Sequence, residues 1–200
     1  MAEIQAETGE PIGNSRHPIH LVVTDDLERN RLTVLFRLFL AIPHFIWAAI
    51  WGLGAYLVVI VAWFIALFVG RVPDGIHNFL AGYVRYQAHV YAYVSLAANP
   101  FPAFMPAAGY PVDFEIAPAA KQNRLVTFFR FLLVIPAIIV LYVLQLVAYV
   151  VMVLGWFYSL VTGKMAKGMR DLLAYWIRYQ SQTIGYILLV TSRYPSFSDD

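Results

Sequence analysis

Long apolar runs alternate with short polar segments along this 200-residue chain. Two stretches of 26 residues, 44–69 and 137–162, contain no Asp, Glu, Lys or Arg. An α-helix rises 1.5 Å per residue, so each run would form a helix about 39 Å long, more than the roughly 30 Å hydrocarbon core of a bilayer. The pattern therefore predicts two membrane-spanning helices.

Each apolar run is followed by a polar turn and a second helical segment, residues 76–98 in one case and 169–191 in the other. One face of each segment carries small and polar residues, with Arg85 on the first and Arg178 on the second. Such a stripe is typical of a membrane helix that packs against other helices. We therefore expect about four transmembrane helices in all. The alternative for these two segments is a helix that lies in the membrane interface.

Two shorter elements precede each apolar run. Apolar residues alternate along 19–23 and along 112–116, and this period of two predicts short surface strands that pair with each other or with a neighbouring protomer. After each strand comes an apolar stretch with a narrow cationic face, which predicts an amphipathic helix at the membrane interface. Pro43 and Pro136 then predict a break or a kink.

The chain is a tandem duplication. Aligned with an offset of 93 residues, 27 of the 75 pairs from Asn30/Asn123 to Phe104/Phe197 are identical. The alignment needs no gap, so each copy is expected to fold into the same set of elements.

The repeat also sets the domain boundaries. The first unit spans residues 17–104 and the second spans 110–197, with a Pro-, Ala- and Gly-rich linker at 105–109. Residues 1–16 have no signal-peptide pattern and are expected to form a disordered leader, and 198–200 form a polar tail.

Two spans per unit would insert both copies the same way up, with the pseudo-twofold axis along the membrane normal. Charge then sets the orientation, because loops rich in Lys and Arg stay in the cytoplasm. The side with the termini and the linker would carry eight such residues and the side with the turns four, so we expect both termini in the cytoplasm. The eight are Arg16, Arg29, Arg31, Arg37, Lys121, Arg124, Arg130 and Arg193, and the four are Arg71, Lys164, Lys167 and Arg170.

Composition separates this chain from soluble domains. Hydrophobic residues make up 60% and charged residues 13%, against roughly 45–50% and 25% in soluble proteins. The net charge of +2 is too small for a nucleic-acid-binding surface. With no Cys, disulfides, thiolate metal sites and thiol catalysis are excluded. The predicted fold class is an all-α integral membrane protein with a tandem duplication, two interfacial helices and short surface strands.

Arg85 and Arg178 are the most distinctive polar residues, since each falls about nine residues into a predicted span. An arginine there costs several kcal/mol unless it is paired or hydrated, and the carboxylates of these segments, Asp74 and Asp171, stand only at the entrances. The functional interpretation is an anion or lipid-headgroup site, and the alternative is a structural arginine bound to backbone carbonyls. Neighbours that would complete such a site are Gln87, Gln180, Tyr86 and Tyr179.

Four further arginines flank the apolar runs. They could reach lipid phosphates at the membrane interface, where each attracts anionic lipid by about 1 kcal/mol. The alternative is ordinary flanking charge that anchors and orients the helices. These residues are Arg31, Arg37, Arg124 and Arg130.

Catalytic signatures are missing from the sequence. The five histidines all lie in the first unit and show no ligand spacing, so we expect no metal site. The chain has no P-loop, no GxSxG motif and no clustered pair of carboxylates for acid–base chemistry. We therefore expect neither an enzyme nor a bound cofactor.

One series of motifs recurs in both units. It begins with Asn-Arg-Leu and Phe-Arg, continues through Ile-Pro and Trp-Phe to Gly-Arg or Gly-Lys, and ends with a helical Arg-Tyr pair and an aromatic-Pro-x-Phe turn. The series resembles the bacterial membrane proteins grouped as domain of unknown function 4389. Departures are Lys164 in place of arginine and the ending at residues 99–101. The resemblance implies a membrane fold but no activity, cofactor or substrate.

The sequence thus favours a non-enzymatic accessory or scaffold protein of the bacterial inner membrane. It would bind a partner membrane protein, anionic lipid or further copies of itself. The alternative is a small anion-selective channel or transporter lined by Arg85 and Arg178. A hydrated path normally needs more polar residues than these spans contain, and this favours the first hypothesis.

Overall fold

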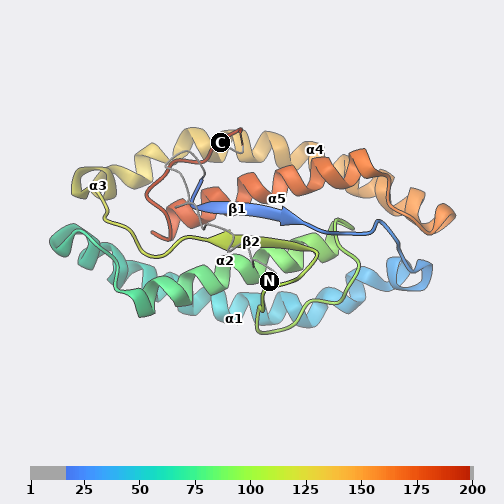
Figure 1. Ribbon diagram of the computed structural model, residues 1–200, viewed down its shortest axis with the longest axis horizontal. Coiled ribbons are helices and arrows are strands. Elements are labelled where there is room, and N and C mark those ends of the chain that lie inside the picture. The colour runs from blue at the N-terminus through green and yellow to red at the C-terminus, as the bar shows by residue number, and fades with distance from the viewer. Residues whose placement is uncertain (1–16, 199–200) are drawn as a thin grey trace, which may run out of the picture.

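The computed structural model describes residues 17–198 and is mostly helical (Figure 1). The predicted leader, residues 1–16, lies outside the described residues. Each unit contributes one strand, a long helical segment and a shorter helix, in the same order. The elements are β1 (Ile19–Val23), α1 (Arg31–Val69), α2 (Asp74–Val94), β2 (Val112–Ile116), α3 (Arg124–Leu133), α4 (Ile135–Thr162) and α5 (Lys167–Ile187).

Equivalent residues begin and end the long helical segments in both units. The Asn30 side chain accepts hydrogen bonds from two amides in the first turn of α1, and Asn123 does the same for α3. Gly70 and Gly163 follow α1 and α4 with φ of 79° and 75°, a left-handed conformation that favours glycine. The ends of these segments are therefore encoded locally and in the same way twice.

The two prolines have different effects. Pro136 stands in the first turn of α4, directly after the boundary with α3, where its missing amide would have no helical partner. Pro43 lies inside α1, which continues through it. The predicted break thus occurs at Pro136 only, and a separate amphipathic helix exists only in the second unit.

The two predicted strands pair with each other. They form an antiparallel sheet in which Ile19 faces Ile116 and Leu21 faces Phe114. Leu21 and Phe114 are equivalent positions of the repeat, separated by 93 residues, so the sheet is symmetric about this pair. An approximate twofold axis therefore passes through the centre of the sheet.

This axis is perpendicular to the long helices, which run in opposite directions (Figure 1). Trp63 near the end of α1 donates from Nε1 to the Thr127 carbonyl near the start of α3, at 2.9 Å. Trp156 near the end of α4 donates to the Val34 carbonyl near the start of α1, at 3.0 Å. The expectation that the long helices of the two copies run parallel is therefore wrong, because antiparallel pairing of equivalent strands reverses the helix direction.

Basic residues gather at both ends of the molecule. Lys164, in the turn after α4, pairs with Glu28 just before α1, with Nζ 2.9 Å from Oε1. At the other end, Arg71 after α1 forms an isolated backbone bridge with Lys121 before α3. Each end of the molecule therefore contains a turn of one unit and the start of a helix of the other unit. This removes the charge asymmetry on which the prediction of cytoplasmic termini depends.

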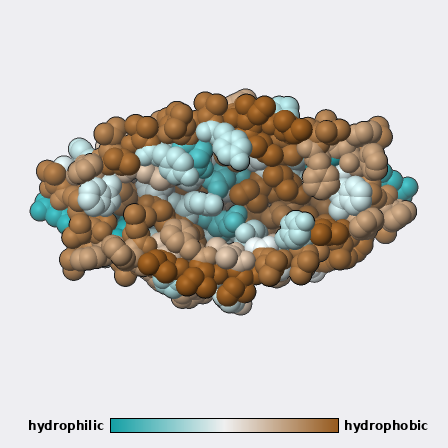
Figure 2. All heavy atoms as spheres, turned by 180° about the vertical axis from the view of Figure 1, so that it is seen from behind, coloured by the Kyte–Doolittle hydropathy of each residue, from teal (hydrophilic) through white to brown (hydrophobic). Residues whose placement is uncertain are grey.

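Two of the described helices, α1 and α4, are long and apolar enough to cross a membrane by length and composition. Only 17% and 11% of their most apolar windows are buried, and apolar side chains cover both helices (Figure 2). The shorter helices α2 and α5 instead supply much of the interior, including Tyr86, Tyr93, Trp176 and Tyr179. Of the four predicted spans, two thus remain as candidates within residues 17–198.

A glycine in α5 accommodates a large residue of β1. A Cβ atom at Gly185 would lie 2.2 Å from Cδ1 of Ile19. The equivalent positions hold Ala92 in the first unit and Val112 in the second, both fully buried, so a larger helix residue accompanies a smaller strand residue. We expect Gly185→Ala to lower the free energy of unfolding by about 1–3 kcal/mol, because overpacking forces side chains out of their rotamers.

The double variant Gly185→Ala with Ile19→Val should recover most of that loss, as measured by thermal unfolding in detergent. Gly168→Ala is the matched control, since a Cβ atom there meets nothing within 4 Å. Equal losses for the two alanine variants would contradict the packing argument.

Candidate functional site

Arg37 and Arg130 are equivalent residues of the repeat and both are buried. Nη1 of Arg37 donates to the carbonyls of Tyr93 and Ala98, at 2.8 and 3.1 Å. The guanidinium carbon lies 4.4 Å from the centroid of the Tyr93 ring, a cation–π distance. Arg37 therefore binds one carbonyl in the last turn of α2 and another in the segment that follows the helix.

Arg130 repeats this arrangement at the end of α5. Nη1 donates to the carbonyls of Tyr186 and Thr191, and Nη2 donates to Oε1 of Gln122 at 2.7 Å. The guanidinium carbon lies 4.3 Å from the Tyr186 ring centroid. Both guanidinium groups thus face the interior and bind backbone carbonyls, so neither lies exposed at the interface as predicted, and a phosphate contact of either one stays a prediction.

Arg31 and Arg124, the other two flanking arginines, are exposed. Arg31 lies beside Gly163 at the end of α4, and Arg124 lies beside Gly70 at the end of α1. A cation near a helix C-terminus complements the negative end of the helix dipole. These two side chains remain accessible, and their contact with lipid phosphates stays a prediction.

Arg85 lies against the sheet and pairs with a carboxylate. Its Nε is 3.0 Å from Oδ1 of Asp113 in β2, and an Nη group donates to the Phe114 carbonyl. The same Oδ1 is 2.9 Å from Nε2 of His89, whose ring stacks on Tyr110. Arg85 is thus neutralised by the strand of the other unit.

The charge of Asp113 is stabilised by these contacts. Burial raises the pKa of Asp113, but hydrogen bonds from His89 and the Phe114 amide, together with the charge of Arg85, lower it more, so the net pKa lies below its ordinary value of 3.8. Sequence reasoning missed Asp113 because it considered partners only within the helical segments. The available signal was a strand in which two carboxylates, Asp113 and Glu115, alternate with apolar residues.

The second unit holds its arginine differently. Arg178 donates to the Phe197 carbonyl at 2.7 Å and lies over the Tyr175 ring, 4.9 Å from its centroid. The strand residue equivalent to Asp113 is His20. The two arginines therefore share a position in the repeat but not a chemical environment.

Arg85, Tyr86 and Gln87 point in three directions, because successive helix residues are about 100° apart. The Tyr86 hydroxyl lies 2.8 Å from Nδ1 of His44 in α1. Nε2 of Gln87 donates to the Tyr83 hydroxyl at 2.6 Å. The predicted single site of arginine, tyrosine and glutamine is therefore not assembled in the first unit.

The same holds in the second unit. Tyr179 is buried and its ring stacks on Phe197, with centroids 5.3 Å apart. Gln180 is buried, and its Oε1 has no hydrogen-bond partner in the described part of the chain. Both side chains belong to the packed interior, and an anion-binding role for them stays a prediction.

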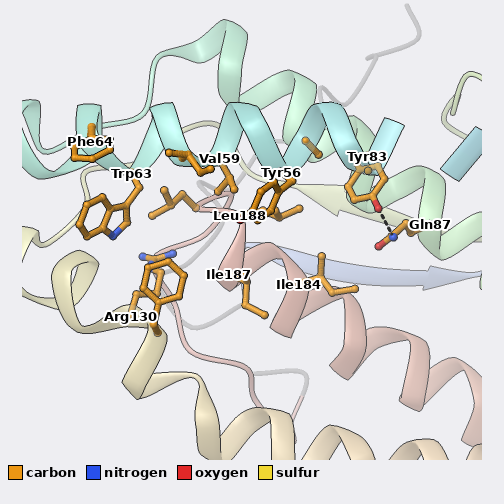
Figure 3. Close-up of a pocket in the computed structure, with 15 residues that line it drawn as sticks. Tyr56, Val59, Trp63, Phe64, Tyr83, Gln87, Arg130, Ile184, Ile187 and Leu188 are labelled. Carbon is orange, nitrogen blue, oxygen red and sulfur yellow. Dashed lines mark hydrogen bonds between the residues drawn. The ribbon is translucent and has the colours of Figure 1, made fainter. Parts of the chain in front are cut away.

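An apolar cavity of about 600 Å³ lies between α1, α3 and the end of α5 (Figure 3). Aromatic and aliphatic side chains from both units form its walls. This is the largest change from the sequence-based picture, because residues of the two repeats line one space. The wall residues include Tyr56, Val59, Trp63, Phe64, Ile184 and Ile187.

Polar groups stand at opposite ends of this cavity (Figure 3). Arg130 lies at one end, and the hydrogen-bonded pair of Tyr83 and Gln87 lies at the other. Nε of Arg130 and Oε1 of Gln87 are buried and have no hydrogen-bond partner among residues 17–198. The Arg130 side chain is only 3% exposed, and its hydrogen-bond acceptors are neutral. The cavity can therefore hold an apolar chain with an acceptor group next to Arg130.

Both units match one family, described as Domain of unknown function (DUF4389), at residues 31–105 and 124–199. The chain belongs to this family. The resemblance inferred from the repeated motifs is thus confirmed for two tandem copies. No curated protein and no solved structure matches the chain.

The DUF4389 segments contain the helices but not the strands. The first covers α1 and α2 and the second covers α3, α4 and α5, whereas β1 and β2 precede them. Arg85 and Arg130 therefore lie inside DUF4389 segments, and Asp113 lies between them. The cavity is built from DUF4389 residues alone, with both copies contributing.

Proposed function

We propose that this DUF4389 protein is a non-enzymatic protein of the bacterial inner membrane that binds an anionic lipid and serves as an accessory or scaffold subunit. The observation that carries this proposal is the cavity between the two units, with its buried cation at one end. Its volume of about 600 Å³ falls within the roughly 300–1,000 Å³ of small-molecule sites.

The lining of the cavity favours an acyl chain. Its walls between Arg130 and Gln87 consist mainly of apolar side chains, and a membrane surrounds an inserted protein with acyl chains at high concentration. A phosphate or carboxylate oxygen beside Arg130 would accept a charge-assisted hydrogen bond from Nε, which is stronger than a bond between neutral groups. A lipid with an anionic headgroup supplies both the acyl chain for the apolar walls and the acceptor oxygen for Arg130.

Native mass spectrometry of the protein, extracted in mild detergent, tests the proposal. We expect about one anionic lipid to remain bound to each chain. Val59→Trp places a large side chain in the cavity and should reduce the bound lipid at least tenfold. The unfolding temperature should stay the same or rise, because filling a cavity adds apolar contacts.

Val153→Trp is the matched control, because Val153 is 57% exposed on α4 and does not line the cavity. It should retain lipid like the unaltered protein. Lipid retention by Val59→Trp equal to that of Val153→Trp would overturn the proposal, as would an unaltered protein that carries no lipid. A partner protein or a second copy would appear in the same spectra as additional mass.

The anion-channel hypothesis has less support. Arg85 is neutralised by Asp113, and Arg178 donates to the Phe197 carbonyl. A conducting path requires cationic groups that can exchange their partners for the passing anion. Anion flux across vesicles that contain the protein, abolished when Arg85 and Arg178 are both replaced, would support this hypothesis.

A further inference from the structure

We propose that the protein lies in a single leaflet, with α1 and α4 parallel to the membrane plane, rather than crossing the bilayer. In this orientation the twofold axis is along the membrane normal, the sheet faces water, and the opposite face enters hydrocarbon. Four features of the structure carry the proposal: the depth of the sheet, its open edges, the apolar face behind it and the length of α1.

The sheet lies beside the middle of the helices rather than beside their ends (Figure 1). Arg85, which binds Asp113 of β2, is near the middle of Asp74–Val94. Gln182, well inside Lys167–Ile187, donates to the Ile19 carbonyl of β1 at 3.2 Å. If the long helices crossed a bilayer, both strands would therefore lie at the depth of its hydrocarbon core.

A sheet at that depth is incompatible with hydrocarbon. Among residues 17–198 the sheet has two strands, so each strand has one edge with no neighbouring strand, although side chains bind the backbone of Ile19 and Phe114. Open edges facing lipid do not occur in the hydrocarbon region, where an unsatisfied backbone group costs several kcal/mol. Glu115 of β2 is exposed as well, and a charged side chain at the bilayer centre costs roughly 2.5 kcal/mol or more.

The face behind the sheet fits hydrocarbon. Figure 2 shows apolar side chains along both long helices, with polar residues gathered at the two ends and in the hollow between the helices. One leaflet supplies about 15 Å of hydrocarbon, enough to take up a helix about 10 Å in diameter. Exposed apolar residues of these helices include Leu53, Leu57, Ile60, Leu146, Val150 and Val153.

The length of α1 agrees with this orientation. Its 39 residues extend about 58 Å at 1.5 Å per residue, roughly twice the thickness of the hydrocarbon core. Exposed Leu32 and Phe39 at one end and Phe68 at the other show that its apolar surface extends over nearly the whole length. A helix lying in one leaflet keeps all of this surface in hydrocarbon, whereas a crossing helix does not.

Cysteine labelling distinguishes the orientations, because the chain has no native cysteine. The test uses four full-length single variants at exposed positions, Arg31→Cys, Arg71→Cys, Lys121→Cys and Lys164→Cys. Each is treated with a membrane-impermeant maleimide in inverted and in right-side-out vesicles. Thermal unfolding of each variant verifies that it is folded.

Each orientation of the protein in the membrane predicts a different labelling pattern for these four cysteines. If the protein lies in one leaflet, all four cysteines react from the same side of the membrane. If antiparallel helices cross the bilayer, Arg31→Cys and Lys164→Cys react from one side and the other two from the opposite side. If both units cross in parallel, Arg31→Cys and Lys121→Cys react together. Either of the last two results overturns the proposal.

Two further cysteines test depth directly. Glu115→Cys, on the sheet, should react from the same side as the four end positions. Leu53 is 65% exposed in the protein. Leu53→Cys should be protected from the maleimide in vesicles. It should react after the protein has been extracted into detergent and unfolded. Protection of Glu115→Cys in folded protein would contradict the single-leaflet orientation.

Discussion

Arg130→Met should lower the free energy of unfolding by about 3 kcal/mol, because three acceptors lose the arginine as a donor, and one of them, the Tyr186 carbonyl, keeps the Leu189 amide. They are the carbonyls of Tyr186 and Thr191 and the amide oxygen of Gln122. A buried acceptor without a partner costs roughly 1–3 kcal/mol. Denaturant unfolding in detergent, followed by tryptophan fluorescence, measures the loss. Arg130→Lys should recover only part of it, because an ammonium lacks the planar fork that reaches several acceptors.

Arg124→Met is the matched control for this prediction. Arg124 lies in the same helix but is exposed, and surface substitutions usually change stability by less than about 0.5 kcal/mol. Arg37→Met, the equivalent change in the first unit, should resemble Arg130→Met. If Arg130→Met were no more destabilising than Arg124→Met, the inward-facing arginines would not be structural.

The direction of Arg37 could have been predicted from the spacing along α1. Val34, Arg37, Ala41 and His44 recur every three or four residues and form its buried stripe. In a soluble helix the apolar face is buried, but in this helix both faces are apolar and the small and polar residues mark the inside. The expectation that Arg37 lies at the interface came from the rule that a helix buries its apolar face. That rule applies to soluble proteins and does not hold for a helix exposed to lipid.

The repeat, the strands and the Asn and Gly helix ends follow from the sequence because each depends on local residue chemistry. The relative orientation of the two units does not. An offset of 93 residues establishes which positions are equivalent but not the symmetry axis that relates them. That axis is fixed by the pairing of Leu21 with Phe114, a contact between distant parts of the chain. The cavity follows from the same orientation, so it could not be predicted either.

Asp113→Asn should be the second most destabilising substitution, with a loss of about 2–3 kcal/mol at neutral pH. It removes the negative charge that pairs with Arg85 and His89. Removing one partner of a fully buried pair costs roughly 3–5 kcal/mol, and the side chain of Arg85 is 28% exposed, so water lowers this cost. In the double variant with Arg85→Met the two losses should not add, because the arginine is no longer left unpaired.

The pH dependence of unfolding separates a charge effect from a packing effect at Asp113. Its pKa in the folded protein lies below the ordinary 3.8, so the unfolded chain binds the proton more tightly. The stabilisation is complete above about pH 4 and is lost as the pH falls through the folded pKa. Asp113→Asn should lack this acid-dependent component, whereas Glu115→Gln, an exposed position on the same strand, should retain it. Identical acid profiles for Asp113→Asn and the unaltered protein would mean that the carboxylate acts through packing alone and does not hold the sheet to α2 by its charge.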